Sequence, residues 1–311
     1  MVTKQQRISD VFGLHGELPF LNVPAHTDGR MFVDPAAIRL HPDPEPFKTI
    51  ALACMDTFVD QVTKHVLHRS RNSKQEGLDL LRRFTEPSET HLGMTRRGVK
   101  GHGGSDDVAR WIWDALTQDG DALVSFAIFK QIEDLPLFVE GIAEDITSDI
   151  TTRLIFSALV DFTHKMTQQY HQIPANAPLT KESKVLWDHE AEAWTERTIE
   201  LPTLDGRQLV LVPTHWARPN LLVSRERYYQ VAVLDFIQET TATITLEGRV
   251  LKTSKKSLKE SGNYPRDCGN LVRMTVKALR EDIDLMRQFK DFVKAKYAPV
   301  DPDRIEQRLA A

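Results

Sequence analysis

The sequence predicts a helix-rich α+β protein that contains a small antiparallel β-hairpin. Apolar residues recur at steps of three and four along several segments, and this is the period of an amphipathic helix. An Asp-Gly pair, Asp205-Gly206, separates two runs of β-branched and aliphatic residues, which is the strongest short-range signal for a hairpin. With 311 residues, of which 41% are hydrophobic, the chain can build a core in one large domain or in two.

In the first part of the chain, the residue pattern predicts a short strand followed by two helices. The strand is Met31–Val33, and Asp34-Pro35 ends it because proline disfavours further extension of a paired strand. A helix is expected from Pro46 to His68, where apolar residues recur at steps of three and four. A second helix is expected from Ser73 to Phe84, and a loop from Thr85 to Gly104 follows it.

The middle of the chain predicts further core helices. Ser105 is a good N-cap for a helix whose apolar face runs through residues 108–116, and residues 123–129 suit a short apolar helix or strand. Residues 135–141 read as extended. A long helix of roughly seven turns should then run from Glu144 to Tyr170, with an apolar residue at every fourth position.

A change of composition marks the best linker, residues 171–182, which carry two prolines and no apolar period. A short helix is expected around 184–194, and strands at 198–201 and 209–212 flank the Asp-Gly turn. We therefore expect two domains. Residues 1–172 form a helical domain, and residues 183–311 form an α+β domain with the hairpin and basic helices.

The last part of the chain predicts a helix over 224–239, a strand over 242–246 and a helix of several turns whose apolar positions run from Leu271 to Val293. This part is basic. Residues 249–297 contain 13 Lys and Arg against 6 Asp and Glu, a local charge of +7, although the whole chain carries −4. The chain is therefore not a uniformly basic protein that coats nucleic acid. Any surface that binds nucleic acid has to be local.

Composition also limits the class of protein and the cellular compartment that we expect. Cys54 and Cys268 belong to no Cys or His cluster, which excludes a disulfide scaffold and a zinc ribbon. No apolar stretch approaches the ~18 residues of a membrane span, and the first twenty residues lack the apolar core of a signal peptide. We expect a cytoplasmic protein that does not enter a membrane.

Two carboxylates and two hydroxyls share a predicted helix face. Asp145, Ser148, Asp149 and Thr152 stand at i, i+3, i+4 and i+7. Oxygen ligands that converge in this way suit Mg²⁺ or Mn²⁺, which use one or two carboxylates and leave positions for water and phosphate. The structural alternative is equally concrete: acidic residues in a first turn complement the helix dipole, and a Ser or Thr there caps the helix.

A glycine-rich, cationic loop follows the second helix. Five glycines lie between Gly93 and Gly104, beside Arg96, Arg97, Lys100 and His102. Glycine lets backbone N–H groups approach an anion, so a phosphate or a nucleic-acid backbone could dock here. No Gly-Lys-Ser/Thr follows, so this is not a Walker loop, and an ordinary surface loop is the alternative. Lys255 and Lys256 extend the basic surface of the C-terminal part.

Other polar and aromatic patterns favour structural interpretations. His65 and His68 at i, i+3 would need a third ligand to bind a metal, and the large aromatics Trp187, Trp194 and Trp216 suit a core better than base stacking. Common hydrolase motifs are absent. A compact metal nuclease places a Glu-x-Lys on a strand, and the predicted strand ending at 211–215 has neither residue.

Several segments together resemble a family of uncharacterised prokaryotic proteins that is associated with mobile and antiviral-defence gene neighbourhoods. The resemblance spans about residues 18–238. It rests on four segments, which read here Asp28-Gly-Arg-Met-Phe-Val-Asp-Pro35, Ser88-Glu-Thr-His-Leu-Gly93, Gly141-Ile-Ala-Glu-Asp-Ile-Thr-Ser-Asp149, and Leu201-Pro202 with Leu211-Val-Pro213. Ala143 replaces a glycine of the family pattern and Thr214 replaces a lysine, so a catalytic lysine at that position would be lost.

Two functions follow as hypotheses. The first is an antiphage-defence protein that acts on nucleic acid as a Mg²⁺- or Mn²⁺-dependent phosphodiesterase. Its catalytic residues would be Asp149, Asp145, Glu89 and Ser148, its metal ligands Asp145, Asp149 and Glu140, and its phosphate contacts Arg96, Arg97, Lys100, His102, Lys255 and Lys256. The second is a non-catalytic sensor or adaptor subunit that docks a protein partner encoded by a neighbouring gene.

Overall fold

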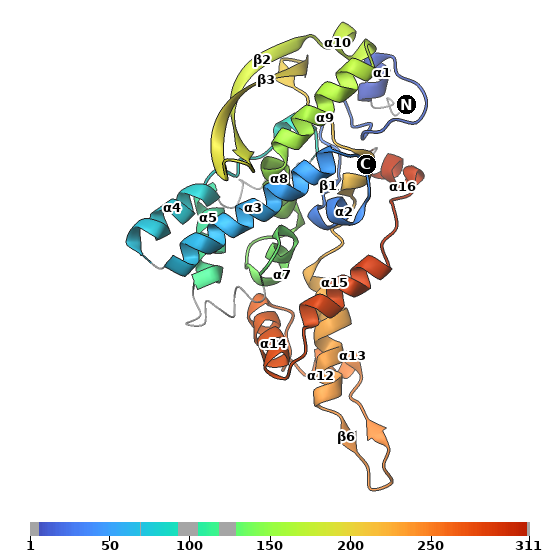
Figure 1. Cartoon of the computed structure of the whole chain (residues 1–311). Helices are drawn as coiled ribbons and strands as arrows, with labels where there is room; N and C mark the ends of the chain where they lie inside the picture. Colours follow the sequence, from blue (N-terminus) through green and yellow to red (C-terminus); the bar gives the residue numbers. More distant parts are fainter. Residues whose placement is uncertain (1–5, 69, 93–104, 118–128, 310–311) are drawn as a thin grey trace.

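The computed structural model describes residues 6–68, 70–92, 105–117 and 129–309. Helices predominate, and the strands of these residues form three small antiparallel sheets, so the predicted helix-rich α+β class is confirmed (Figure 1). The predicted apolar segment 123–129 lies outside the described residues except for Phe129, which is buried. No helix in the described ranges has the length and apolar character needed to cross a membrane.

The first hydrophobic core surrounds the long helix α3 (Phe47–His68), which begins and ends close to its predicted bounds. Helices that pack against α3 are α2 Pro35–Leu40, α4 Arg71–Leu81, α5 Ser105–Thr117, α8 Glu144–Leu154 and α9 Phe156–Gln169. The same core continues to α1 Ile8–Phe12 and α10 Gln172–Asn176, which pack against each other. Aromatic rings fill the centre of this core. The ring of Phe58 meets the ring of Trp187 edge to face, with centroids 5.0 Å apart.

The predicted helix over residues 144–170 is two helices. It breaks at Ile155, and α8 and α9 run on either side of that residue, each with its own buried face. Residues 135–138, read as extended, form the short helix α7 (Leu135–Phe138), with Pro136 in its first turn, where a missing N–H costs nothing. An apolar run of four residues carries no period, which is why pattern alone misread it.

A long ribbon of two strands lies across α9 and was predicted only in part. Strands β2 (Leu179–Asp188) and β3 (Ala193–Leu204) pair antiparallel from Leu179↔Pro202 to Asp188↔Ala193. The short strand β4 (Arg207–Gln208) continues the sheet across the Asp205-Gly206 turn, so the predicted hairpin turn is confirmed. The predicted second strand over 209–212 is wrong, because these buried residues lie beyond β4 and outside the sheet. The predicted helix over 184–194 is wrong, and the predicted linker 171–182 holds α10 and the start of β2.

The second hydrophobic core is built mainly from the last third of the chain. Its elements are α7 and the segments α11 Arg225–Tyr228, η4 Tyr229–Val233 (a π-helical turn), α12 Leu234–Thr240, α13 Lys255–Glu260, α14 Cys268–Arg280 and α15 Leu285–Ala295. The predicted C-terminal helix through Leu271 and Val293 is broken. Asp282 adopts a positive φ of 59°, and the side chain of Asp284 caps α15. The expected division into domains 1–172 and 183–311 stays a prediction, and the ribbon packs with the first core.

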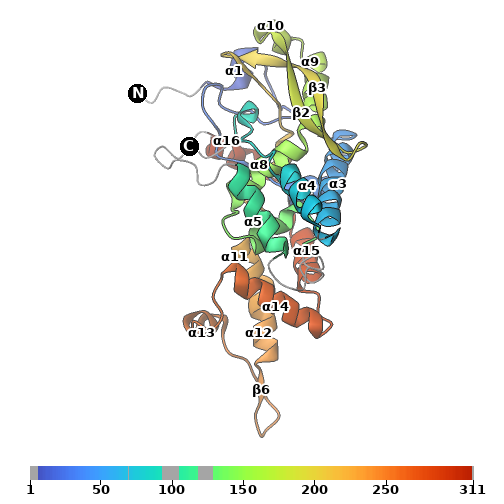
Figure 2. The ribbon, with the colours of Figure 1, turned by 90° about the vertical axis from the view of Figure 1, so that its left-hand side faces the viewer.

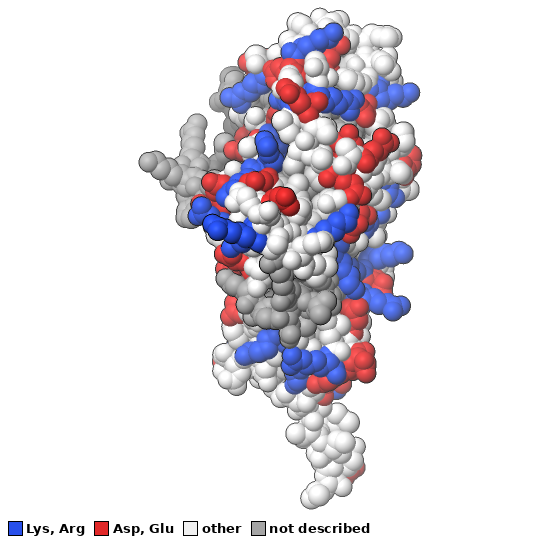
Figure 3. Space-filling model, turned by 60° about the vertical axis from the view of Figure 1, so that its left-hand side comes forward, with Lys and Arg blue, Asp and Glu red and all other residues white. Residues whose placement is uncertain are grey.

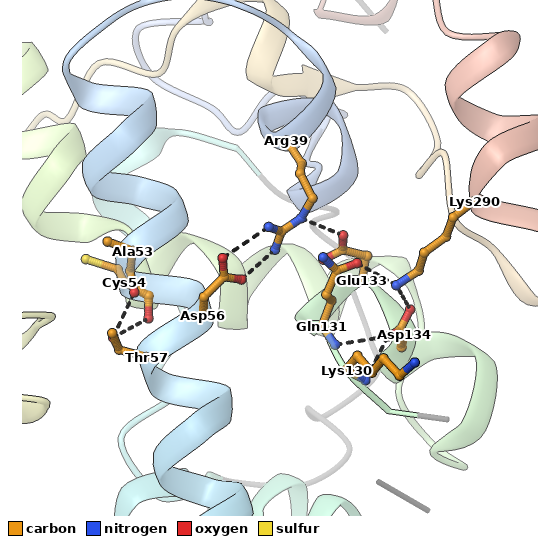
Figure 4. Close-up of polar contacts among 10 residues, drawn as sticks. All are labelled: Arg39, Ala53, Cys54, Asp56, Thr57, Lys130, Gln131, Glu133, Asp134 and Lys290. Carbon is orange, nitrogen blue, oxygen red and sulfur yellow. Dashed lines mark hydrogen bonds and ion pairs between the residues drawn. The ribbon is translucent and has the colours of Figure 1, made fainter. Parts of the chain in front are cut away.

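A charged network bridges the two cores (Figure 4). Arg39 of α2 donates to Glu133 through Nε at 2.9 Å and holds Asp56 of α3 with both terminal nitrogens, at 2.8 and 3.2 Å. One residue further on, the fully buried Asp134 receives the ammonium of Lys290 from α15 at 2.6 Å. The short helix η2 (Ile132–Asp134) thus presents one carboxylate to each core.

A thin hairpin projects beyond both cores at the end of the molecule opposite the ribbon (Figures 1 and 2). Its strands are β6 (Thr243–Ile244) and β7 (Val250–Leu251). Large aliphatic side chains on it are exposed to solvent: Ile244, Leu246, Val250 and Leu251. In Figure 3, acidic and basic side chains intermingle over the body of the molecule, whereas this projection is mostly white.

The chain returns to the first core at its end. Helix α16 (Pro302–Leu309) buries Ile305 and Leu309 there, after α15 has completed the second core. Near the other end of the described chain, Arg7 pairs with Glu306 of α16 at 2.9 Å. A separate small sheet pairs β1 (Phe32–Val33) with β5 (Ala217–Arg218), and η3 (Thr214–Trp216) directly precedes β5.

Candidate functional site

The acidic helix face predicted on α8 exists, but its hydroxyls do not belong to it. Asp145 is exposed and Asp149 is half-buried, whereas Ser148 and Thr152 are buried. The Ser148 hydroxyl accepts a hydrogen bond from the backbone N–H of Val33 at 2.9 Å and so holds β1 against α8. The Thr152 hydroxyl donates to the carbonyl of Ser148. The contacts of Ser148 therefore explain its place in the fold, and its catalytic role stays a prediction.

Asp149 is electrostatically the most unusual group on this face. Burial, reinforced by the negative charges of Glu86 and Asp145, raises its pKa from 3.8 to about 7, and the guanidinium of Arg153 opposes the shift. Glu86 and Asp145 are thus close enough to disfavour the charge of Asp149. A bound cation would stabilise this site, because it relieves the repulsion between the carboxylates and keeps Asp149 ionised.

Glu89 lies beside this face as the centre of a buried ion-pair network. It belongs to the short helix η1 (Ser88–Thr90), and its carboxylate meets Lys184 at 2.7 Å and Arg153 at 3.2 Å. Burial opposes the charge of Glu89, yet these two cations outweigh it and the pKa of Glu89 is lowered. Arg153 also donates to the carbonyls of Thr85 and Glu86, which fixes the turn that carries Glu89.

Lys184 is a site residue that sequence reasoning missed. It stands on β2 in the order Glu182-Ser183-Lys184, and residues i and i+2 of a strand share a face. Its ammonium lies 3.3 Å from the carboxylate of Glu182 as well as against Glu89. The Glu-x-Lys signal was present in the sequence. It was sought on the strand ending at 211–215, because residues 184–194 read as a helix.

The remaining predicted metal ligand, Glu140, has other partners. It is exposed and lies 3.6 Å from Arg225, at the start of α11. Among the described residues, no group of three His, Cys, Asp or Glu side chains is arranged to hold a metal ion. A divalent cation at this site would therefore have Asp145 and Asp149 as protein ligands and would take its other oxygens from water and phosphate, a common arrangement for Mg²⁺.

The structure describes only some of the predicted phosphate-binding residues. Arg96, Arg97, Lys100 and His102 lie outside the described residues. Lys255 is engaged locally, because its ammonium meets Asp235 at 2.5 Å and the carbonyl of Gln230.

Lys256 is exposed and lies 3.9 Å from Glu260 on the same helix. Neighbouring acidic groups thus offset part of the basic character of the C-terminal segment, which weakens it as a phosphate-binding surface.

The other patterns considered from sequence have structural explanations. Trp187 and Trp216 are fully buried in the first core, and the indole of Trp194 donates to the carbonyl of Leu80. His65 contacts the hydroxyl of Ser73 and lies 3.4 Å from Glu76, while His68 turns back to the carbonyl of Lys64. His65 and His68 therefore bind separate partners and do not form a shared metal site.

Asp34, in the segment 28–35, has a structural role in this fold. Asp34 is buried: it caps α2 through the N–H groups of Ala36 and Ala37 and accepts from the N–H of Leu222. Burial raises its pKa to about 6, although these N–H groups oppose the shift.

The two departures from the family pattern are also accommodated. Ala143 precedes α8 in an extended conformation that needs no glycine, whereas Gly141 has a φ of 85° and packs on Trp111. Thr214 donates to the carbonyl of Leu18.

The fold and the site define a helix-rich α+β protein with an acidic helix face beside a buried Glu, Lys and Arg network. Residues 13–224 match the family described as Domain of unknown function (DUF8370), and because this is more than half of the chain, the chain belongs to that family. No curated protein and no solved structure matches the chain. The matched region holds α8, η1 and β2, and therefore every element of the candidate site.

Proposed function

We propose that the protein is a Mg²⁺- or Mn²⁺-dependent phosphodiesterase that acts on nucleic acid, with its active site between α8, η1 and β2. The observation that carries the proposal is the ion pair that brings Lys184 of a strand-borne Glu-x-Lys to Glu89, whose other partner, Arg153, acts on Asp149 of α8. Carboxylates can bind a metal ion, and the nearby cations can bind the negatively charged phosphodiester. The combination therefore suits metal-dependent phosphodiester cleavage.

Each group has a role in this proposal. Asp145 and Asp149 hold the cation, which polarises the phosphodiester when bound. Lys184 and Arg153 are the cations nearest to Glu89, and they stabilise negative charge that develops on the phosphate. Glu89 keeps both of them in place in the absence of substrate, because removing either would leave its buried charge underpaired.

The direct test is cleavage of plasmid DNA, single-stranded DNA and RNA by the purified protein, with and without Mg²⁺ or Mn²⁺. We expect metal-dependent cleavage that Asp149→Ala and Lys184→Ala abolish. The matched controls are Asp114→Ala, an exposed acid on α5, and Lys181→Ala, an exposed lysine on the same strand. Both controls should retain activity. Absence of cleavage in every condition, or cleavage that survives Asp149→Ala, would refute the proposal.

The resemblance to defence-associated proteins supports a role in antiphage defence inside the cell. The expected result is that cells carrying the gene with its neighbours plate phage less efficiently than cells with an empty vector. Asp149→Ala should restore plating if catalysis provides the defence. Equal plating of a broad phage panel on all three strains would contradict the defence role without bearing on the chemistry.

A second candidate function is a non-catalytic adaptor that docks a protein encoded by a neighbouring gene. The observation that favours it is the projecting hairpin, whose exposed aliphatic side chains serve neither core. Pull-down against the purified products of the neighbouring genes tests it. Val250→Ser/Leu251→Ser should abolish capture of the partner, and the surface change Lys256→Ser on α13 should not. Capture that survives the hairpin variant would exclude this docking route.

A further inference from the structure

A cleft of about 560 Å³ lies on the first core, and none of its lining residues belongs to the candidate active site. Its walls come from four parts of the chain: residues 16–22, the loop 41–44, the end of α9 at 169–170, and the turn 213–215. Helix α16 closes it through Pro302, Ile305 and Glu306. This volume falls within the ~300–1,000 Å³ of ordinary small-molecule sites.

Among the described residues that line the cleft, the charged ones have one sign. They are Glu17, Asp43 and Glu306, and no described lysine or arginine lines it. Arg7 reaches Glu306 and neutralises part of this charge, so Glu17 and Asp43 set the potential. A concave surface with acidic groups and low-dielectric walls concentrates cations and repels anions. The site therefore disfavours a phosphate or a nucleotide.

Two histidines form one wall of the cleft. The rings of His41 and His215 lie with centroids 4.4 Å apart, and the Tyr297 hydroxyl is 3.1 Å from Nδ1 of His41. Burial lowers the pKa of His41, and His215 and Lys48 lower it further while Asp43 opposes them, which favours the neutral form of this ring. Nδ1 of His215 is buried and has no hydrogen-bond partner among the described residues. A neutral imidazole tolerates a neighbouring cation, whereas a protonated one would repel it.

An aromatic face completes the arrangement. Tyr170 lines the cleft, and its ring meets Phe20 edge to face at 5.9 Å, which fixes the orientation of the phenol. An amine or guanidinium group over such a ring is stabilised by the interaction of its charge with the ring. Carboxylates at the rim and aromatic rings within are the recurrent means of holding an organic cation.

We propose that this cleft binds a small organic cation with amine or guanidinium groups. The proposal concerns a second site and does not depend on the phosphodiesterase activity. Asp43 and Glu17 provide the counter-charge, Tyr170 provides the ring, and His41 and His215 provide imidazole nitrogen atoms beside them.

Isothermal titration calorimetry of the full chain with spermidine and with agmatine at pH 7.5 tests the proposal, and citrate serves as the anionic probe. We expect both cations to bind and citrate not to bind. Asp43→Asn/Glu17→Gln should raise Kd at least tenfold, and Tyr170→Leu should raise it several-fold. The matched control, Asp291→Asn/Glu281→Gln, removes two exposed acids from the second core and should leave Kd unchanged.

Three results would overturn the proposal: no heat with either cation up to about 10 mM, an equal loss of affinity in the control variant, or preferential binding of citrate. Should the cleft variant fail to fold, the wild-type protein still decides the matter. In proton NMR spectra, the imidazole resonances of His41 and His215 should shift on addition of spermidine, and those of the exposed His68 should not.

Discussion

The ammonium of Lys184 lies 2.7 Å from Oε1 of Glu89, although 95 positions separate the two residues in the chain. This contact joins the middle of β2 to the turn that follows α4, and Arg153 of α8 closes the arrangement from the other side at 3.2 Å. Three separate elements are thus held by one buried carboxylate. The candidate site depends on this junction more than on any single helix.

Removing Lys184 should weaken both the fold and the proposed reaction. Lys184→Ala leaves Glu89 buried with Arg153 alone, and we expect a loss of about 1–3 kcal/mol in the free energy of unfolding. Urea denaturation measures it. Lys181→Ala on the same strand is exposed and should change stability by less than about 0.5 kcal/mol. Equal stabilities of the two variants would show that the ion pair contributes nothing.

Asp149→Asn should stabilise the protein at high pH and have little effect at low pH. The folded-state pKa of Asp149 is about 7 against an ordinary 3.8, so the native state binds more protons between these values and its stability falls as pH rises through them. Asparagine removes the charge. We expect a gain of about 1–3 kcal/mol at pH 8 and almost none at pH 4.

Urea denaturation of wild type and variant at both pH values, in the presence of EDTA, makes the comparison. Asp114→Asn is the matched control and should behave like wild type at both pH values, because that carboxylate is exposed. A gain for Asp149→Asn that is the same at pH 4 and pH 8 would contradict the raised pKa.

Lys290→Met should loosen the attachment of α15. Burial raises the pKa of Asp134 to about 6, Lys290 opposes the shift and Glu133 adds to it. Without the lysine, ionised Asp134 has no cation at 2.6 Å, so the loss of stability should grow as pH rises and reach about 3–5 kcal/mol at pH 8. Hydrogen exchange along α15 should accelerate with it.

Two further variants check this reading. Lys290→Met/Asp134→Asn should recover part of the lost stability, because no buried charge remains. Lys294→Met removes an exposed lysine from the same helix and should be close to neutral. If Lys290→Met were equally destabilising at pH 5 and pH 8, the ion pair with Asp134 would not explain its effect.

Gly77→Ala should destabilise the contact between α4 and α5. A Cβ atom at Gly77 would stand 2.1 Å from a ring carbon of the buried Trp113, and a rigid indole in a packed core cannot yield at small cost. We expect a loss of about 1–3 kcal/mol by thermal or urea denaturation.

Gly269→Ala in the first turn of α14 is the control, since the nearest atom to its Cβ would be 3.6 Å away. That change should be neutral or stabilising by up to about 1 kcal/mol. Similar losses at both glycines would point to a general glycine effect and away from the packing of Trp113.

Periodicity was a good guide where a helix buries a continuous stripe. Helix α3 repeats its apolar residues at steps of three and four, so its position followed from the sequence alone. Strand β2 could not be recognised in the same way. Over most of its length both faces are exposed and polar, and only Leu186 and Trp187 enter the core, so it lacks the apolar alternation of a strand.

The candidate site likewise contains one part that local spacing predicts and one part that it does not. Asp145 and Asp149 are one helical turn apart, so their proximity could be predicted from spacing. The contact of Lys184 with Glu89 depends on how the ribbon crosses the helices, and no local pattern encodes a contact between distant segments. The burial of Ser148 was missed for a related reason, since its partner, the N–H of Val33, is 115 positions away.

The return of α16 to the first core has a consequence for the order of folding during synthesis. Ile305 and Leu309 fill that core, and Gly29 lies so close to the Leu309 side chain that a Cβ there would clash at 2.4 Å. The ribosome must therefore release the whole of the second core before the first can close. Until then the part of the first core that Ile305 and Leu309 cover stays open to chaperones, and a chain that stops before α16 should be cleared by proteases.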